Sequence, residues 1–410
     1  MQQKVKLAAV AAAVASFSGS AFAQSSVTIY GIIDYGINYV NNAQVAQAGA
    51  PNGRVSGHQW FNNSSILQGN RLGFRGTEDL GGGYSALFVL ENGFDVGTGK
   101  FQQGGDLFGR QAYVGLATPY GKLTLGRQYD EMVDYLGPIS TAAYVGAYGD
   151  HPSDLDNVGN DFRVNNALKF SSLKYSGFSF SALYGFGNNA SSFQTNSVKS
   201  FGASYSYGKF TIAAAYLYAN SPNQSFWGNN ATSSTTGNNL GSVTGVTSNP
   251  IIAGFASAKG LETYGAGAIY IIGPVTSGFM YNRIRFDDLG ASSSGTLSLT
   301  NPLGYTGDAS FDNYSMYSTW YITPALYVTG AYDYLTGGSV DGKPGARYHT
   351  FNAIVTYFLS KRTSLYLNAN YQRALGTDST GKGAVASMVA LTPSNTGKQV
   401  AVRAGIRHLF

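Results

Sequence analysis

The stretch VTIYGIIDYGINYV, residues 27–40, alternates between apolar and polar side chains at a period of two residues. Ile29 and Ile37 belong to an apolar row, and Asp34 and Asn38 belong to a polar row. Strict alternation over this length is typical of a β-strand with one apolar face and one hydrated face. Such a strand fits a wall that separates an apolar medium from water.

The same pattern returns along the chain. We count sixteen segments of this kind, and the connections between them alternate between tight turns and long Gly/Ser/Asn-rich loops, notably 219–260 and 374–398. The segments span residues 27–40, 65–79, 84–95, 107–117, 121–129, 166–176, 178–187, 199–208, 210–219, 262–272, 275–287, 311–322, 325–335, 348–359, 363–373 and 399–410. Outer-membrane barrels have this asymmetry of short turns and long loops. The low-complexity segment 229–249 predicts a mobile surface loop.

Composition supports a membrane barrel over a soluble domain. Only 11% of the residues are charged, although 43% are hydrophobic, whereas soluble proteins carry about 25% charged residues. No apolar run reaches the roughly 20 residues that a spanning helix needs. The chain has no cysteine, which excludes disulfides and Cys-ligated metals, and its net charge of +5 without basic runs gives no case for nucleic acid.

The first residues predict a secretory signal peptide. Lys4 and Lys6 precede nine apolar residues, 7–15, and Ala21-Phe22-Ala23 forms an A-x-A cleavage site before Gln24. We therefore expect residues 1–23 to be removed on export and residues 24–410 to form one barrel domain. Their removal lowers the net charge to +3.

The last segment predicts how the barrel closes. Val400, Val402 and Ile406 share a face opposite Arg403 and Arg407. Closure against the first strand would remove both sheet edges, and this is required in lipid because an unpaired backbone group costs several kcal/mol there. We expect the terminal Phe410 to lie beside the first strand.

A long acidic loop follows the strand that ends near Gln128. It has only one basic residue, Arg163, and seven acids: Asp130, Glu131, Asp134, Asp150, Asp154, Asp156 and Asp161. One reading is a plain surface loop with solvated acids. The other is a functional loop, because structureless loops of this length are uncommon in compact domains otherwise.

Several motifs together resemble the general diffusion porins of the Gram-negative outer membrane, especially the beta-proteobacterial branch. They are SSVTIYGIIDYGI after the signal, NRLGFRGTEDLGGG at 70–83, LFGRQAYVGL at 107–116, GKLTLGRQ at 121–128 and the terminal Phe410. The resemblance spans essentially the whole mature chain. It implies a transmembrane antiparallel up-and-down β-barrel of sixteen strands, assembled as a homotrimer. It also implies that the third long loop, residues 128–165, folds into the lumen as a constriction.

The resemblance also implies which residues line the constriction. Arg71 and Arg110 match wall arginines of the family, and alternation places Arg71 and Arg75 towards the lumen. Arg127 falls at a family arginine position but shares parity with Leu125, so it must lie above the lipid belt or behind a local break. The loop acids expected to face these arginines are Asp130, Glu131, Asp134, Asp150 and Asp154.

Arginines facing carboxylates across water create a transverse field that orients polar solutes and sets ion preference. Lumenal arginines are fixed by parity whereas loop acids are not, so the sequence predicts a passive channel for ions and small hydrophilic solutes that weakly favours anions. Expected surroundings are outer-membrane lipid and lipopolysaccharide, with no cofactor, metal or nucleic acid.

Three alternatives stay open. An outer-membrane enzyme needs a nucleophile, a base and an orienting group within reach, and the four histidines form no convincing set, so we expect no enzyme. A substrate-specific channel would show lumenal aromatics, and Tyr30, Tyr348 and Tyr366 are inward by parity. A surface adhesin on the same barrel would use long loops such as 219–260.

Overall fold

The structure is a computed structural model that describes residues 26–50, 54–224, 239–240, 249–290, 293–294, 297–298, 301, 303–339, 342 and 345–410. The expected signal peptide, 1–23, lies outside these residues, as does most of the low-complexity segment 229–249. Among the described residues, no helix is long and apolar enough to cross a membrane.

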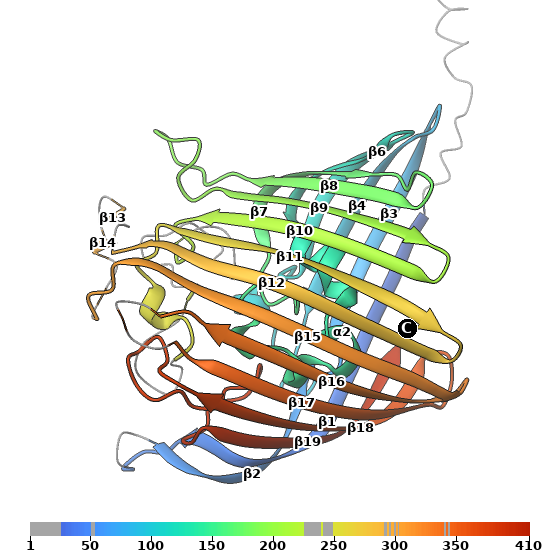
Figure 1. Cartoon of the computed structure of the whole chain (residues 1–410). Helices are drawn as coiled ribbons and strands as arrows, with labels where there is room; N and C mark the ends of the chain where they lie inside the picture. The colour runs from blue at the N-terminus through green and yellow to red at the C-terminus, as the bar shows by residue number, and fades with distance from the viewer. Residues whose placement is uncertain are drawn as a thin grey trace, which may run out of the picture.

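Strands make up nearly all of the regular structure (Figure 1). They are β1 (Ser26–Ala46), β2 (Arg54–Ser64), β3 (Arg71–Gly81), β4 (Tyr84–Gly93), β5 (Gln111–Thr118), β6 (Gly121–Gln128), β7 (Val164–Ser172), β8 (Phe178–Gly185), β9 (Val198–Tyr207), β10 (Phe210–Asn220), β11 (Gly260–Ile272), β12 (Val275–Leu289), β13 (Ser293–Ser294), β14 (Leu297–Ser298), β15 (Gly307–Thr323), β16 (Leu326–Gly337), β17 (Arg347–Phe358), β18 (Thr363–Leu375) and β19 (Lys398–Leu409). The helical turns are η2 (Gln103–Gly105), η3 (Met132–Leu136), η4 (Gly137–Ile139), α2 (Ala142–Val145), η5 (Ala147–Gly149), η6 (Pro152–Asp154) and η7 (Ala253–Phe255).

The strands pair in an antiparallel ring, which confirms the predicted sixteen-stranded barrel. The main sheet has seventeen strands, of which β2 is a branch paired to β1, and β13 and β14 form a separate two-stranded sheet. In the ring each strand pairs with its neighbours in chain order, and β1 pairs with both β3 and β19. Tight turns lie at one end of the barrel and the longer loops at the other (Figure 1).

The two ends of the chain close the ring as predicted. β1 and β19 run antiparallel from Ile32↔Leu409 to Val40↔Ala401. Beyond this ladder, the Gly31 amide donates to the Phe410 carbonyl at 3.0 Å, and the Phe410 amide donates to the Gly31 carbonyl at 3.1 Å. Closure leaves neither terminal strand with a bare edge at this seam.

The alternation expected from the sequence separates an apolar exterior from a polar interior. On β1, the side chains of Val27 and Ile29 are 64% and 60% exposed, whereas those of Asp34 and Asn38 are fully buried. On β17, Phe351 is exposed while Thr350 is buried. The exposed apolar residues form the lipid-facing surface that a membrane barrel requires.

One expected strand differs from the structure. The segment predicted at 65–79 becomes a strand only at Arg71, and a strand that was not predicted, β2, precedes it at Arg54–Ser64. β2 pairs with the second half of β1 and β3 pairs with its first half. Residues 65–70 connect the two and leave the wall, which matters for the site.

Candidate functional site

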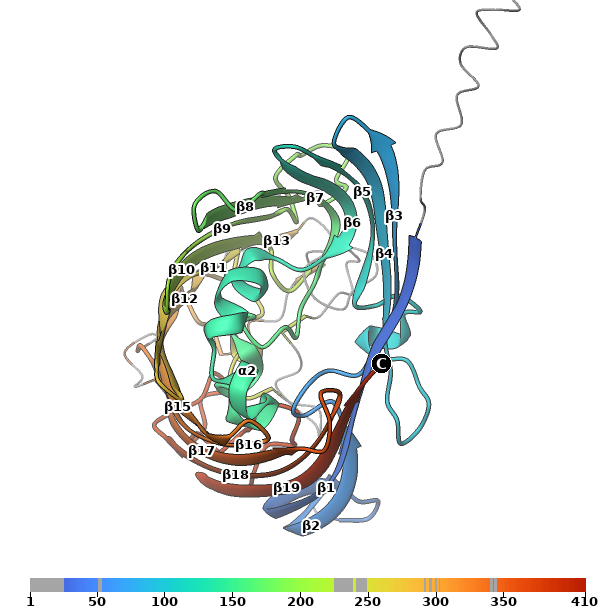
Figure 2. The same cartoon turned by 90° about the vertical axis from the view of Figure 1, so that its right-hand side faces the viewer.

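The loop between β6 and β7 packs against the inward-facing side chains of the barrel. Asn352 of β17 donates to the Gly149 carbonyl at 3.3 Å, and Asn368 of β18 donates to the Val145 carbonyl at 2.7 Å. Both asparagines belong to the buried, polar row of their strands. Figure 2 shows the segment that carries α2 within the outline of the barrel.

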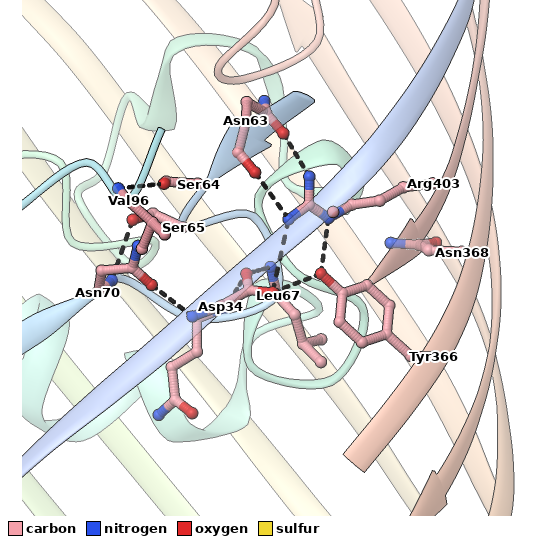
Figure 3. Close-up of polar contacts among 12 residues, drawn as sticks. Asp34, Asn63, Ser64, Ser65, Leu67, Asn70, Val96, Tyr366, Asn368 and Arg403 are labelled. Carbon is pink, nitrogen blue, oxygen red and sulfur yellow. Dashed lines mark hydrogen bonds and ion pairs between the residues drawn. The ribbon is translucent and has the colours of Figure 1, made fainter. Parts of the chain in front are cut away.

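A second inward segment, residues 65–70, is held by Asp34. The backbone amides of Leu67 and Gln68 donate to Oδ2 of Asp34 at 2.7 and 3.2 Å. In return the Asp34 amide donates to Oδ1 of Asn70 at 2.5 Å. Figure 3 shows Asp34 at the centre of these contacts. Because one carboxylate accepts hydrogen bonds from two loop amides, the chain can leave the sheet here without leaving buried backbone amides unpaired.

Asp34 also links this segment to the closure seam. Its Oδ1 accepts from the Tyr366 hydroxyl and lies 3.5 Å from the guanidinium of Arg403 (Figure 3). Arg403 is fully buried, donates to Tyr366 at 2.6 Å and also binds Asn63. Tyr366, which faces inward, thus binds a buried arginine within the wall.

Between the two inward segments and the wall lies a polar cavity of about 740 Å³. Its lining comes from residues 65–69 and 71, from Gln102, Gln103 and Arg110, from the loop after β6, and from two residues near the end of the chain, Val389 and Arg407. Six lining residues are ionisable: Arg71, Arg110, Asp150, Asp161, Arg163 and Arg407. Basic groups therefore outnumber acidic groups along the cavity.

Arg110 is the most tightly held of these arginines. It precedes β5, is buried, and donates from Nε to Oε1 of Glu91 at 2.8 Å. It also donates to the hydroxyl of Tyr129 at 2.7 Å. A charge-assisted pair with a second partner fixes the guanidinium firmly.

Arg71 and Arg407 border the same cavity from β3 and β19. Arg71 donates from Nε to the Gly69 carbonyl at 3.0 Å, and Arg407 donates to Oε1 of Gln68 at 3.3 Å. Neither contact is to an acid, so their positive charge remains directed to the cavity. The inward segment therefore also orients the arginines.

Two predicted arginines lie elsewhere in the described structure. Arg75 is exposed and its guanidinium stacks over the ring of Tyr30 at 5.3 Å. Arg127 donates to the Gly109 carbonyl at 2.8 Å and binds Asn165. Alternation along β6 would place Arg127 on the same face as Leu125. A register shift between Gly126 and Gln128 in the pairing with β7 interrupts this alternation, as the sequence allowed. Neither residue belongs to the lining of the 740 Å³ cavity.

Three predicted acids near the start of the loop, Asp130, Glu131 and Asp134, are not among the residues that line this cavity. Asp130 is fully buried, and it accepts from the Met132 amide at 2.9 Å and from Asn157 at 2.6 Å. Burial, together with the neighbouring Glu131 charge, raises the pKa of Asp130 to about 7. Glu131 and Asp134 bind the ammonium of Lys169 at 3.2 and 2.5 Å.

Asp150 and Asp154 belong to a buried cluster around His151. The imidazole Nδ1 lies 3.0 Å from Asp150, and Nε2 lies 3.2 Å from Asp156. Burial opposes the charged imidazole, but the two carboxylates prevail and raise the pKa of His151 well above its usual value. Burial and nearby acids, Asp150 first, raise the pKa of Asp154 well above its usual range.

Of the described residues, the group with the spacing to hold a cation is Asp150, His151 and Asp154. Both imidazole nitrogens already face carboxylates, which suits an imidazolium bridging two acids. Of the predicted acids, Asp150 lines the cavity, and its Oδ2 has no hydrogen-bond partner among the described residues.

Of the ionisable residues that line the cavity, sequence reasoning missed Asp161, Arg163 and Arg407 as site residues. Arg407 could have been found, because alternation in the last strand places it inward. Arg163 is the one basic residue of an acidic loop, but only the folded loop brings it beside Tyr129, at 5.7 Å from the ring. Burial and the nearby Arg110 and Arg127 lower the pKa of Arg163 to about 10, so it is charged at neutral pH.

A closed barrel with an apolar exterior and a charged internal cavity defines the class: a β-barrel of the bacterial outer membrane. A family model described as Gram-negative porin matches residues 8–377. This match covers most of the chain, so the chain belongs to the Gram-negative porin family and resides in the outer membrane.

Relatives agree with this family. An outer membrane porin protein of Bordetella pertussis is 30% identical over 422 residues, which cover 98% of this chain and 98% of that protein. Outer membrane porin protein 32 of Delftia acidovorans is 27% identical, covering 99% of this chain and 100% of that protein. Among solved structures, the anion-selective porin from Comamonas acidovorans matches with a TM-score of 0.66 at 22% identity, covering 94% of this chain and 100% of that one.

Proposed function

We propose that this porin forms a water-filled channel for passive diffusion of ions and small hydrophilic solutes, and that it weakly favours anions. The carrying observation is the cavity lining, where Arg71, Arg110, Arg163 and Arg407 outnumber Asp150 and Asp161. A lining with excess positive charge concentrates anions and repels cations. The solved anion-selective porin from Comamonas acidovorans, which this chain resembles in fold, supports the same sign.

The loop 128–165 would be the constriction loop. Its acids Asp130, Glu131 and Asp134 do not line the cavity and instead accept a hydrogen bond from Asn157 or share the ammonium of Lys169, so they oppose the arginines weakly. Arg75 and Arg127, which lie off the lining, would contribute to the field only from a distance.

General diffusion fits better than substrate-specific transport. Tyr348 and Tyr366 are inward but almost fully buried, and the cavity lining includes neither of them nor Tyr30. Among the described residues that line the cavity, Phe162 is the one aromatic residue, so the lining offers no row of rings on which sugars could stack. We also propose that the protein is not an enzyme, since channel function needs no reacting group; a screen for lipase and protease activity tests this.

We further propose that residues 1–23 are removed, that residues 24–410 form the barrel domain, and that three copies assemble in lipid and lipopolysaccharide. One solved relative, the outer membrane protein OmpT of Vibrio cholerae, is described in a trimer form. Native mass spectrometry of the extracted protein measures both the mature chain length and the copy number, and a monomer would contradict the trimer.

The reversal potential in a salt gradient across a planar bilayer tests the function. We expect the wild-type channel to show the sign of anion preference, and Arg71→Ala with Arg407→Ala to move the potential towards cation preference. Arg347→Ala with Arg373→Ala removes the same two charges from exposed residues of β17 and β18, so this double variant is the matched control. An equal response in both variants would place the selectivity outside this cavity.

A further inference from the structure

The last long loop, between β18 and β19, folds as a small hairpin with an ordered tip. The Ala386 amide donates to the Thr396 carbonyl at 2.9 Å, and the Ser394 amide donates to the Ala386 carbonyl at 2.7 Å. At the tip, the Leu391 amide donates to the Met388 carbonyl at 3.1 Å. The hairpin therefore has its own backbone pairing and a defined turn.

Side chains of three neighbouring strands hold this hairpin in place. Gln372 of β18 accepts from the Ser387 amide at 2.6 Å. Gln44 of β1 donates to the Ser394 carbonyl at 2.8 Å, and Gln399 of β19 donates to the Thr392 carbonyl at 3.4 Å. Anchors on both sides of the closure seam fix the direction in which the tip points.

The tip points into the barrel, where it meets both inward segments described above. Met388 is 1% exposed and belongs to one buried cluster with Ile66 of the 65–70 segment and Tyr148 of the loop after β6. The next residue, Val389, lines the 740 Å³ cavity together with Arg71 and Arg407. Met388 therefore anchors the tip by buried packing, whereas its neighbour Val389 borders the cavity.

We propose that the tip Met388–Leu391 is a third side of the channel's narrow passage, and that Val389 is a specificity-determining residue there. The proposal rests on the channel function proposed above. The tip adds an uncharged, apolar side to a lining whose ionisable groups lie on the wall and on the loop after β6. It would limit solute size without adding a charge to the transverse field.

A charge placed at Val389 tests the position directly. In water, a unit charge about 8 Å from a passing ion changes the local ion concentration about two-fold for each sign. We expect Val389→Asp to shift the reversal potential towards cation preference and Val389→Lys to shift it towards anion preference. The matched controls are Asn395→Asp and Asn395→Lys, which place the same charges at an exposed residue of the same loop.

A shortened tip tests the size limit. Replacing Met388–Leu391 by Gly-Gly should raise the single-channel conductance and speed the swelling of protein-loaded liposomes in larger sugars. The heat-dependent shift in gel mobility of the folded barrel shows whether each variant is assembled. If the shortened form does not fold, Val389→Trp tests the same point, because it keeps the tip and should lower the conductance.

The outcomes separate the two proposals. A wild-type protein that conducts no ions overturns the channel function itself. A conducting wild type whose Val389 variants behave like the Asn395 variants, with conductance unchanged in Val389→Trp, overturns the role of the tip and leaves the channel function standing.

Discussion

At the scale of single residues, the site is organised by buried partners of the arginines. Glu91 holds Arg110 at 2.8 Å and also accepts from the hydroxyls of Tyr30 and Tyr129, each at 2.9 Å. The side chains of Arg110 and Glu91 are only 5% and 3% exposed. Removing one member of a buried pair leaves an uncompensated charge, whereas replacing both avoids this.

Arg110→Ala should therefore cost about 3–5 kcal/mol of unfolding free energy. Arg110→Met combined with Glu91→Gln should recover most of that loss, because neither replacement is charged. Urea unfolding of the refolded protein in detergent, followed by tryptophan fluorescence, measures both. A double variant no more stable than Arg110→Ala would mean that the pair is not the source of the loss.

The arginines also show how far single residues could be predicted. Arg71 was predicted from alternation and Arg407 could have been, because the ladders that join β1 to β3 and to β19 run without a register shift. The loop acids do not follow from any period. Asp130 and Glu131 turn away from the cavity because Asn157 and Lys169 meet them from other elements, and those contacts exist only in the folded chain.

At the scale of elements, the strands were predictable and the inward segments were not. Each ring strand has one apolar and one polar row, so its period identifies it. β2 lacks an apolar row, since both of its faces are largely exposed and polar. Residues 65–70 were included in the predicted strand 65–79, but Ile66 and Leu67 are buried against Tyr148 and Val145 inside the barrel.

Asp34→Asn should loosen the 65–70 segment. An amide offers one acceptor oxygen in place of two, so the Leu67 and Gln68 amides or the Arg403 guanidinium lose their partner. An unmet buried hydrogen bond costs about 1–3 kcal/mol, which corresponds to an acceleration of amide exchange between roughly five-fold and more than a hundred-fold. Hydrogen exchange with mass spectrometry measures peptides that cover residues 65–70.

The matched control for this prediction is Asp79→Asn, near the end of β3. That carboxylate also accepts a backbone amide, from Gly81 at 2.9 Å, but it is exposed to solvent. Unchanged exchange at 65–70 in Asp34→Asn would show that the wall contacts, and not the carboxylate, hold the segment. The same variant should also increase open-channel current noise, since the segment orients Arg71 and Arg407.

At the scale of the whole molecule, the wall of the barrel is a low-dielectric layer that surrounds the charged side chains lining the cavity. The exterior is apolar, so field lines from the cavity arginines concentrate along the aqueous passage. Several arginines are held by neutral partners, such as Gly69 and Gln68, and keep their charge uncompensated. Ion preference is therefore a property of the summed lining and not of one binding residue.

A summed field of this kind is sensitive to screening. The Debye length falls from about 10 Å at 0.1 M salt to about 3 Å at 1 M. We expect the anion preference to decrease steadily when the mean salt concentration is raised at a constant gradient ratio, and Arg71→Ala with Arg407→Ala to flatten this dependence. Reversal potentials at matched ratios measure both trends. A preference that stays constant up to 1 M would mean that anions make direct contact with the guanidinium groups, because contact pairs are screened far less than charges separated by water.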